Sequence, residues 1–376
     1  MEQFSLADFS DELAFLKHKK STDWKWTKAN DYPKEKNGIK VFSCFACGGG
    51  STMGYKLAGC EVIGCCEIDP RMNEVYVKNH NPKYNFLMDI RDFNKKDDLP
   101  EELYNLDILD GSPPCTTFSM VGKREESWGK KKKFREGQAE QTLDDLSFVF
   151  IDTVAKLRPK VMIMENVEGL IKGEAWSYVQ KIYKQLSDIG YKCKHWLLKG
   201  ENMGVPQKRH RVFFVATRLD FDLDKIDMAF NYETITYKEI KQGRLKLIGR
   251  ETKFYKIAEN ATEQDKSIAD TRIRMGDKGS AFQTYYIRSN DIMPTIRSKP
   301  DVIDLSEIGY INWETIRNSQ TFPQDYNFMP NTEGNVGYIC GMSVPPIMIK
   351  RIVNRLIESG LFDYKKELNH VKRKDN

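Results

Sequence analysis

A cysteine that directly follows two prolines is the residue of this sequence best placed to do chemistry. Cys115 comes after Ser112-Pro113-Pro114, and this turn follows an apolar run at residues 106–110. Proline fixes the backbone, so the chain itself aims the thiol. A thiolate is the strongest nucleophile available near neutral pH. Most cysteines are structural, but this setting predicts that Cys115 is a catalytic nucleophile.

A glycine-rich loop, Cys47-Gly48-Gly49-Gly50-Ser51, follows the strand-like run at residues 40–45. In doubly wound folds, this position lets backbone amides approach a nucleotide-like ligand. The loop does not spell G-x-G-x-x-G, because Met53 occupies the third glycine position counted from Gly48. A dinucleotide-dependent dehydrogenase is therefore disfavoured. Taken alone, the loop is equally compatible with a tight turn that binds nothing.

Two acidic residues stand at the ends of the next strand-like runs. Glu67 follows the run at residues 61–66 and is placed to accept hydrogen bonds from a ribose diol. Asp89, in Leu87-Met88-Asp89-Ile90, stands at the expected end of a third strand and could bind an adenine amino group. Taken alone, Asp89 is more typical of a surface aspartate.

The elements that must position these residues alternate between strands and helices. Short apolar runs lie at residues 40–45, 61–66, 106–110 and 161–165, and a helix is predicted over 143–157. Near-continuous apolar strands separated by helices are typical of a parallel sheet covered on both faces. The predicted fold class is α/β, with a doubly wound, mostly parallel, Rossmann-like sheet and a second, smaller lobe.

The composition changes along the chain and divides it into segments. Residues 1–38 are polar and are expected to form an extension outside the core, and residues 39–218 form the first lobe. Residues 219–332 are rich in Lys, Tyr and Asp without a βα repeat, which predicts the smaller lobe. Residues 333–376 contain an amphipathic helix opened by Pro345-Pro346 and are expected to complete the first lobe.

Composition also excludes several classes of protein. The 376-residue chain is 40% hydrophobic and 30% charged, which suits a soluble globular protein. Lys and Arg exceed Asp and Glu, 59 against 54, so a polyanionic partner is permitted. There is no run of 18 apolar residues and no basic and apolar leader at the N-terminus. We therefore expect a cytoplasmic protein with no membrane partner.

The cysteines are expected to be free thiols, because eight in a chain of this length are too few for a disulfide scaffold. Cys44-x-x-Cys47, followed by Cys60 and Cys65-Cys66, superficially resembles the spacing of zinc ligands. However, Cys44 and Cys65 fall within apolar strands, and Cys47 belongs to the glycine loop. No metal site is predicted.

Six short motifs, in order along residues 39–357, resemble those of the DNA (cytosine-C5) methyltransferase family. The segment at Cys115 resembles that family's Pro-Cys-x-x-Phe-Ser loop, and the glycine loop resembles Phe-x-Gly-x-Gly-Gly. Glu165-Asn166-Val167 matches Glu-Asn-Val. Gln207-Lys208-Arg209-His210-Arg211 matches Gln-x-Arg-x-Arg. Residues 316–323 match Arg-Leu-Gln-x-Phe-Pro only in part. Gly341-Met342-Ser343-Val344-Pro345-Pro346 resembles Gly-Asn-x-Val-Pro-Pro.

The resemblance implies methyl transfer to C5 of a cytosine flipped out of a specific double-stranded DNA sequence. Cys115 would attack C6, and C5 of the covalent intermediate would take the methyl group of S-adenosyl-L-methionine. Glu165, in its protonated form, would donate to N3 and accept from the N4 amino group. Arg211 would contact O2, and Arg209 would support the site and the phosphates.

The same resemblance implies where cofactor and DNA bind. The S-adenosyl-L-methionine pocket would be formed by Phe45, Ala46, Gly48, Gly49, Gly50, Glu67, Ile68, Asp89, Ile90, Pro113, Ser343 and Val344. DNA would be contacted by Ser119, Lys123, Arg124 and Gln207, while the smaller lobe would read bases in the major groove. The expected enzyme acts as a monomer, and the family setting allows for a companion restriction endonuclease.

The sequence departs from the family pattern at several positions. Cys47 replaces the first loop glycine, and Ser43 stands where an acidic residue usually ends the preceding strand. Thr116 replaces the glutamine that commonly follows the nucleophile, and Met342 replaces the asparagine of the closing motif. Activity is still expected, because the three residues implied in catalysis on the base are all present.

Two alternatives stay open at this point. A tRNA cytosine methyltransferase would use the same fold and motifs, but that branch carries a Cys-Phe-Thr tripeptide in its small lobe, and this sequence has none. A non-catalytic relative would bind or flip DNA without chemistry, and the intact Cys-Glu-Arg set disfavours it. A DNA substrate is therefore the favoured interpretation.

Overall fold

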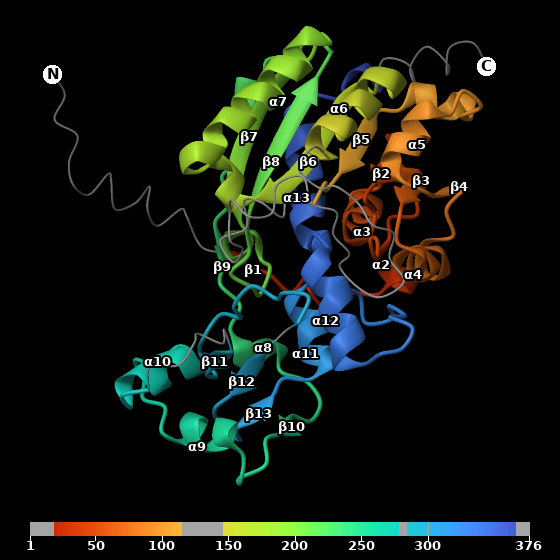
Figure 1. The fold of residues 1–376 in the computed structure, drawn as a ribbon. Coiled ribbons are helices and arrows are strands. Elements are labelled where there is room, and N and C mark those ends of the chain that lie inside the picture. Colours follow the sequence, from red (N-terminus) through yellow and green to blue (C-terminus); the bar gives the residue numbers. More distant parts are fainter. Residues whose placement is uncertain (1–18, 115–145, 278–283, 300, 366–376) are drawn as a thin grey trace, which may run out of the picture.

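The computed structural model describes residues 19–114, 146–277, 284–299 and 301–365 (Figure 1). The predicted nucleophile and three of the predicted DNA contacts, Cys115, Ser119, Lys123 and Arg124, lie outside the described residues.

A seven-stranded sheet forms the centre of the larger lobe, in the order β4-β3-β2-β5-β6-β8-β7. Its strands are β2 Lys40–Cys44, β3 Glu61–Glu67, β4 Tyr84–Leu87, β5 Ile108–Gly111, β6 Val161–Val167, β7 Lys192–Lys199 and β8 His210–Thr217. The first five pair in parallel, and β8 runs antiparallel to both β6 and β7. The predicted mostly parallel, Rossmann-like α/β fold is confirmed. The half-exposed edge strand β7 is one that the apolar runs did not predict.

Helices cover both faces of this sheet, and each face has its own hydrophobic core (Figure 1). One face packs against α3 Gly50–Leu57, α4 Pro70–His80 and α13 Pro346–Glu358. The other packs against α5 Ile90–Lys95, α6 Leu146–Leu157 and α7 Trp176–Asp188. Successive residues of a strand point to opposite faces, so Val41 enters the first core and Phe42 the second.

The C-terminal helices belong to the larger lobe. α13 begins at Pro346, where the missing N–H of proline costs nothing, and it packs against α3. It follows α12 Glu333–Met342. Together the stretch Glu333–Glu358 is long and apolar enough to cross a membrane by composition, but 78% of its most apolar window is buried inside the protein. Burial on this scale is typical of core helices.

The smaller lobe contains a four-stranded sheet in the order β10-β13-β12-β11. The strands are β10 Lys246–Leu247, β11 Tyr285–Ile287, β12 Val302–Asp304 and β13 Gly309–Tyr310, with helices α8 Tyr237–Ile240, α9 Lys253–Glu259 and α10 Ile268–Arg274. Its separate core is small: Ile248, Ile257, Ala258, Ile268, Tyr286 and Ile303. Other residues of 219–332 join the core of the larger lobe. Examples are Ile296 and Ile316, the latter in helix α11 Trp313–Ser319. The composition change at 219 is therefore not a boundary between cores.

The segment before β2 differs from the extension that the sequence predicts. Trp24 and Trp26 are buried in the core of the larger lobe, and the Trp26 indole Nε1 donates to the Thr321 carbonyl oxygen at 2.8 Å. Two short strands, β1 Lys19–Lys20 and β9 Tyr232–Glu233, pair in parallel next to this segment, and α2 Lys28–Asp31 follows. The polar composition of the segment did not indicate this role, because only two tryptophans among many charged residues anchor it.

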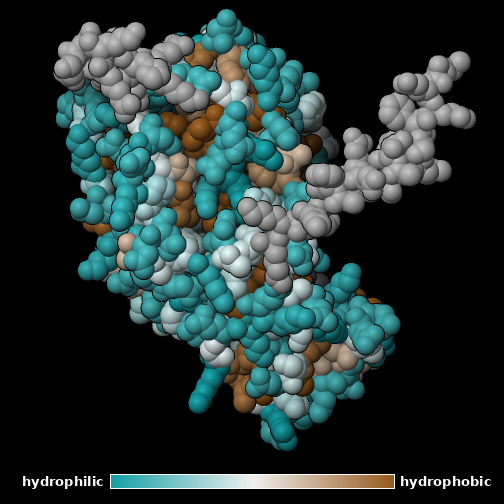
Figure 2. All heavy atoms as spheres, turned by 180° about the vertical axis from the view of Figure 1, so that it is seen from behind, coloured by the Kyte–Doolittle hydropathy of each residue, from teal (hydrophilic) through white to brown (hydrophobic). Residues whose placement is uncertain are grey.

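Short 3-10 helices complete the described chain: η1 Glu101–Asn105, η2 Glu168–Ile171, η3 Gly173–Ala175, η4 Gly200–Met203 and η5 Leu223–Lys225. The surface seen from behind is mostly hydrophilic, with hydrophobic side chains showing only in scattered places (Figure 2). Among the described residues, the most exposed large apolar side chains, Leu247 and Ile273, belong to the smaller lobe.

Candidate active site

Four strands carry a row of polar side chains at one edge of the central sheet, on the face that α3 and α13 cover. In each of β2, β5, β6 and β8, an apolar residue of the first core lies two positions away from a polar residue. The polar residue is the one nearer the C-terminal ends of β2, β5 and β6, and nearer the start of the antiparallel strand β8. Residues two apart in a strand share a face, so these side chains point the same way. The row consists of Ser43, Asp110, Glu165 and Arg211.

Glu165 and Arg211 form an ion pair within this row. The Arg211 Nε donates to the Glu165 Oε1 at 2.8 Å. The side chains are 12% and 15% exposed, so both are largely shielded from water but can still be reached from outside. The sequence predicted that these two residues act on one cytosine, and the structure brings them into direct contact.

The proline turn that leads to Cys115 starts next to this pair. The Asn166 side-chain amide donates to the Pro113 carbonyl oxygen at 3.4 Å, and its Oδ1 accepts from the Val167 amide at 2.8 Å. Asn166 is buried, so it holds the turn against the end of β6. No role was predicted for Asn166, although the residue belongs to the Glu-Asn-Val motif.

Gln207 is an internal residue, which does not fit the predicted DNA contact. Its side chain is fully buried. The amide Nε2 donates to the Gln320 Oε1 at 2.7 Å and to the Ser319 carbonyl at 3.2 Å, and the Oε1 accepts from the Ile296 amide at 2.9 Å. Gln207 therefore joins three segments inside the protein.

Arg209 is also internal. Its guanidinium donates to the carbonyl oxygens of Ile296 at 3.2 Å, Gly341 at 3.1 Å and Ser343 at 2.9 Å. Burial, followed by the nearby charge of Arg211, lowers the pKa of Arg209 to about 9. Of the two predicted roles, this position fits support of the site, and it does not fit contact with phosphates.

The glycine loop is held by the acidic residue at the end of β3. Glu67 Oε2 accepts from the Cys47 amide at 2.7 Å, and Oε1 accepts from the Asp69 amide at 2.9 Å. Burial raises the pKa of the Glu67 carboxyl, and these amide hydrogen bonds oppose the rise. Phe45 and Cys47 both have positive φ, 55° and 45°, so the loop holds two side-chain-bearing residues in a conformation that favours glycine.

The loop ends at the N-terminus of α3, which has features of an anion site. Gly49, the N-cap, is left-handed with φ 80°, and no side chain caps the helix. Gly50 lies against the closing motif so tightly that a Cβ there would overlap the Val344 carbonyl oxygen. The Ser343 hydroxyl is buried and has no hydrogen-bond partner within the described chain. An uncapped helix N-terminus next to an unpartnered hydroxyl can hold a carboxylate.

A small apolar pocket lies on the other side of the loop. It is lined by Phe45, Cys66, Ile68, Met88, Asp89, Ile90 and Leu146. The Asp89 carboxylate caps α5, accepting from the Arg91 amide at 2.8 Å, and lies 3.3 Å from the Arg91 guanidinium. An apolar slot with a carboxylate at its margin suits a heteroaromatic ring bearing an amino group. Four of the lining residues were predicted, and Cys66, Met88 and Leu146 were not, because they lack a motif.

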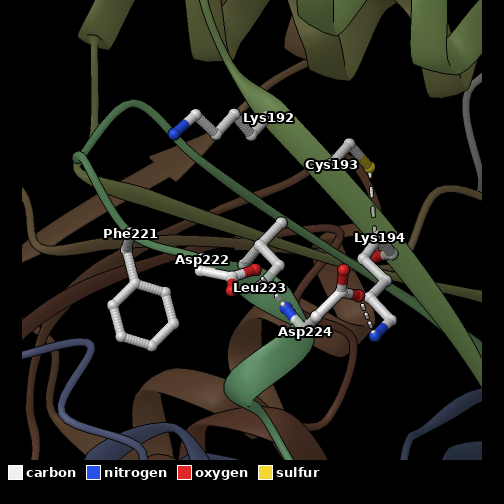
Figure 3. Close-up of a pocket in the computed structure, with 7 residues that line it drawn as sticks. All are labelled: Lys192, Cys193, Lys194, Phe221, Asp222, Leu223 and Asp224. Carbon is white, nitrogen blue, oxygen red and sulfur yellow. Dashed lines mark hydrogen bonds and ion pairs between the residues drawn. The ribbon is translucent and has the colours of Figure 1, made fainter.

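A different pocket lies at the far edge of the sheet, between β7 and η5 (Figure 3). It is lined by Lys192, Cys193, Lys194, Phe221, Asp222, Leu223 and Asp224. Lys194 pairs with Asp224 at 2.6 Å, and Lys192 pairs with Asp220 at 3.2 Å. None of the predicted site residues lines this pocket, so it is not part of the candidate site.

The cysteines weighed as zinc ligands are dispersed among different environments. Cys44, Cys60 and Cys65 are buried free thiols, and burial raises the pKa of Cys60 to about 12. In the described part of the chain, no three His, Cys, Asp or Glu residues are grouped so that they could hold a metal ion.

A mostly parallel seven-stranded sheet, with a glycine loop after β2 and acidic residues at the ends of β3 and β4, defines the Rossmann-like methyltransferase class of fold. Solved structures show the same architecture. A DNMT2 mutant of Spodoptera frugiperda aligns with TM-score 0.59 and 15% identity, covering 85% of this chain and 100% of that one. The Dnmt2 methyltransferase of S. pombe aligns with TM-score 0.55 and 14% identity, covering 86% and 99%.

Sequence comparison defines the family more closely. The family model of the C-5 cytosine-specific DNA methylases matches residues 39–358, and this chain belongs to that family. The Type II methyltransferase M.HindV of Haemophilus influenzae is 27% identical over 327 residues, 85% of this chain and 96% of that protein. M.FnuDI of Fusobacterium nucleatum is 30% identical over 205 residues, and that match spans about half of each protein, 54% of both.

Proposed function

We propose that this protein transfers the methyl group of S-adenosyl-L-methionine to C5 of a flipped-out cytosine in a specific double-stranded DNA sequence. The observation that carries the proposal is the contact between Glu165 and Arg211 at the sheet edge where β5 ends. Cys115 follows the end of β5 by only four residues. Family membership supports the same reaction.

The chemistry needs an activated ring, because cytosine C5 is a weak nucleophile towards a sulfonium methyl group. The Cys115 thiolate attacks C6, and a C5–methyl bond forms as the methyl–sulfur bond breaks. A base then removes the C5 proton, and elimination of the thiolate restores the aromatic ring. Glu165, when protonated, donates to N3 and stabilises the charge that develops during attack. Arg211, which contacts Glu165, would donate to O2.

The residues around the glycine loop fit S-adenosyl-L-methionine. The α3 N-terminus and the Ser343 hydroxyl would bind the methionine carboxylate, because both have unsatisfied hydrogen-bonding capacity. Glu67 is fixed by two amides and keeps free lone pairs for the ribose hydroxyls. Asp89 and its apolar pocket would receive the adenine. The bound sulfonium supplies an electrophilic methyl group.

Double-stranded DNA remains the proposed partner. Ser119, Lys123 and Arg124 stay proposed contacts, while Gln207 is now proposed only to position the segments around it. The smaller lobe is proposed to select the sequence. Names of relatives such as the Type II methyltransferase M.HindV support a bacterial, cytoplasmic setting and a companion restriction endonuclease. We propose that the enzyme acts as a monomer, because each chain contains one complete set of the implied residues.

The proposal is tested in two steps, because the recognised sequence must be found first. Bisulfite sequencing of plasmid DNA from expressing cells identifies the protected cytosines. A duplex with 5-fluorocytosine at that position is then incubated with the protein and S-adenosyl-L-methionine. Fluorine cannot leave as a proton does, so we expect a covalent complex that survives denaturation.

Cys115→Ser is the control, and it is expected to form no covalent complex and to transfer no labelled methyl group. Duplex DNA and tRNA are compared as acceptors with radiolabelled cofactor. Label found only in tRNA would replace the proposed substrate. Label that persists in Cys115→Ser would refute the covalent mechanism.

A further inference from the structure

Asp110 is a buried carboxyl that the proposed mechanism does not use. Its residue is 2% exposed. The Oδ2 accepts from the Ser43 hydroxyl at 2.7 Å, and the Oδ1 accepts from the Tyr55 hydroxyl at 3.0 Å. Within the described residues, these are neutral donors, and no cation pairs with it. Burying a carboxylate without a cation is costly, so burial favours the neutral form of this carboxyl.

Two other buried aspartates show the usual arrangement. Asp107, three residues earlier, is paired with Lys160 at 2.9 Å and Lys365 at 2.7 Å. Asp304 in the smaller lobe accepts from a tyrosine hydroxyl, as Asp110 does, but it is also paired with Lys241 at 2.8 Å. Asp110 is therefore distinctive among these three carboxyls in its lack of a cation.

The neighbours of Asp110 are the elements on which the proposed reaction depends. Ser43 lies four residues before Cys47, where the glycine loop begins, and Tyr55 belongs to α3, whose N-terminus is the proposed carboxylate site. Asp110 itself lies on β5, the strand that leads to Cys115. Glu165 lies on the same face of the next strand. One carboxyl thus links the cofactor loop, its helix and the strand before the nucleophile.

Ser43 and Asp110 are directly opposite each other in the parallel pair of β2 and β5. Ser43 also occupies the position where the family pattern has an acidic residue. In this chain the acid of the cross-strand pair therefore lies on β5 and the hydroxyl on β2, and exchanging the two side chains would retain one acid and one hydroxyl at the same place.

We infer that Asp110 is a positioning residue that, together with Ser43, fixes the cofactor loop and α3 against the strand carrying the nucleophile. This inference rests on the proposed function for its role in catalysis. Its effect on cofactor binding can be measured without any methyl transfer.

The inference predicts a response to pH. Burial is the main reason why the pKa of Asp110 is raised to about 7. The hydrogen bonds from Ser43 and Tyr55 lower this pKa, and the charge of Glu165 raises it. The ionisable groups that interact electrostatically with it are Tyr55 on α3, Tyr76 on α4, Cys44 on β2, which lies on the opposite face of the sheet, and Glu165 on β6. Above pH 7, the carboxylate accepts from both hydroxyls. Below it, one oxygen carries a proton and the positioning weakens.

Ionisation of Asp110 has the opposite effect on the free energy of unfolding. The folded-state pKa is above the ordinary value of 3.8, so the folded protein binds a proton that the unfolded chain has released. This contribution to the free energy of unfolding is present at acid pH and is lost as pH rises to about 7. The ionised Asp110 is therefore favourable for positioning and unfavourable for stability.

The test compares Asp110→Ser with the double variant Ser43→Asp/Asp110→Ser, which moves the acid to the opposite strand. The affinity for S-adenosyl-L-homocysteine is measured by calorimetry, and methyl transfer by single turnover, between pH 6 and 8.5. We expect Asp110→Ser to weaken both about tenfold or more, the scale of losing a hydrogen bond to a charged group. The double variant should recover most of the loss. Asp304→Asn, a matched buried aspartate, should bind as wild type does.

Asp110→Asn, which preserves shape, covers the case in which the serine variants do not fold. It should abolish the inflection near pH 7 seen with the wild type. The inference is overturned if Asp110→Asn keeps that inflection, or if folded Asp110→Ser binds within about threefold of wild type. No recovery in a folded double variant also overturns it. If wild type transfers no methyl group at all, the proposed function fails, and the binding titration alone decides this inference.

Discussion

At the scale of single residues, the carboxyl group of Glu165 accepts a hydrogen bond in the structure but must donate one in the proposed reaction. In the structure it accepts from Arg211 at 2.8 Å, which suits a carboxylate. In the proposed reaction it must donate a proton towards N3 of the ring. Entry of the base would replace part of the contact with Arg211 by contacts with cytosine, so the pair is expected to open or share its hydrogen bonds during catalysis.

Replacing Glu165 by Gln should therefore slow methyl transfer more than it weakens DNA binding. An amide can form hydrogen bonds but cannot donate its proton to the ring, so we expect the single-turnover rate to fall roughly 10²- to 10⁴-fold. DNA affinity, measured by fluorescence anisotropy, should change only a few-fold. Glu168→Gln is the control, because Glu168 is a partly exposed carboxylate paired with Lys172 at 2.6 Å. A Glu165→Gln rate close to wild type would remove Glu165 from the mechanism.

At the scale of elements, the cofactor loop depends on close contact with a segment that is distant in sequence. α3 begins at Gly50, and the closing motif between α12 and α13 crosses it there. A methyl group on Gly50 would overlap the Val344 carbonyl oxygen and approach the Ser343 Cβ. Because a backbone carbonyl cannot move aside as a flexible side chain can, the loop or the motif would have to shift.

Gly50→Ala should consequently weaken binding of S-adenosyl-L-homocysteine by at least about tenfold, as measured by calorimetry. Gly334→Ala is the matched control, since a Cβ at that position in α12 meets nothing within 4 Å. The control should bind normally and should not lower the melting temperature, because alanine favours helix over glycine. Equal affinities in the two variants would show that the α3 N-terminus is not the cofactor site.

At the scale of the whole molecule, the N-terminal segment ties the two lobes to the C-terminal helices. Arg351 on α13 donates to the Met203 carbonyl at 2.8 Å and the Tyr232 hydroxyl at 2.6 Å, and pairs with Asp23 at 3.0 Å. Trp26 lies in the same core and donates to Thr321. This segment is therefore part of the larger lobe and not a separate extension.

Trp26→Ala should lower the free energy of unfolding by about 3–5 kcal/mol, because it leaves a large cavity and an unsatisfied carbonyl. Trp176→Ala provides the comparison, since Trp176 is 44% exposed, and its loss should cost less than about 1 kcal/mol. Urea unfolding followed by circular dichroism measures both. Similar losses would contradict the anchoring role of the N-terminal segment.

The sequence alone determined the features that depend on local spacing. Apolar runs predicted the strands β2, β3, β5 and β6, and the prolines at 345–346 predicted the start of α13. The order of the motifs indicated the family, and the family model bears this out. These features could be predicted because side-chain alternation and turn chemistry are encoded within a few neighbouring residues.

Only the tertiary structure decided which distant residues meet. Gln207 was predicted to contact DNA and Arg209 to support the site and the phosphates, but both are buried against segments about 90 to 130 residues away. Ser43 and Asp110 become a pair only because β2 and β5 are neighbours in the sheet, and Trp26 reaches Thr321 from the opposite end of the chain. Burial and pairing of this kind arise when the elements pack together, so local sequence patterns do not contain them.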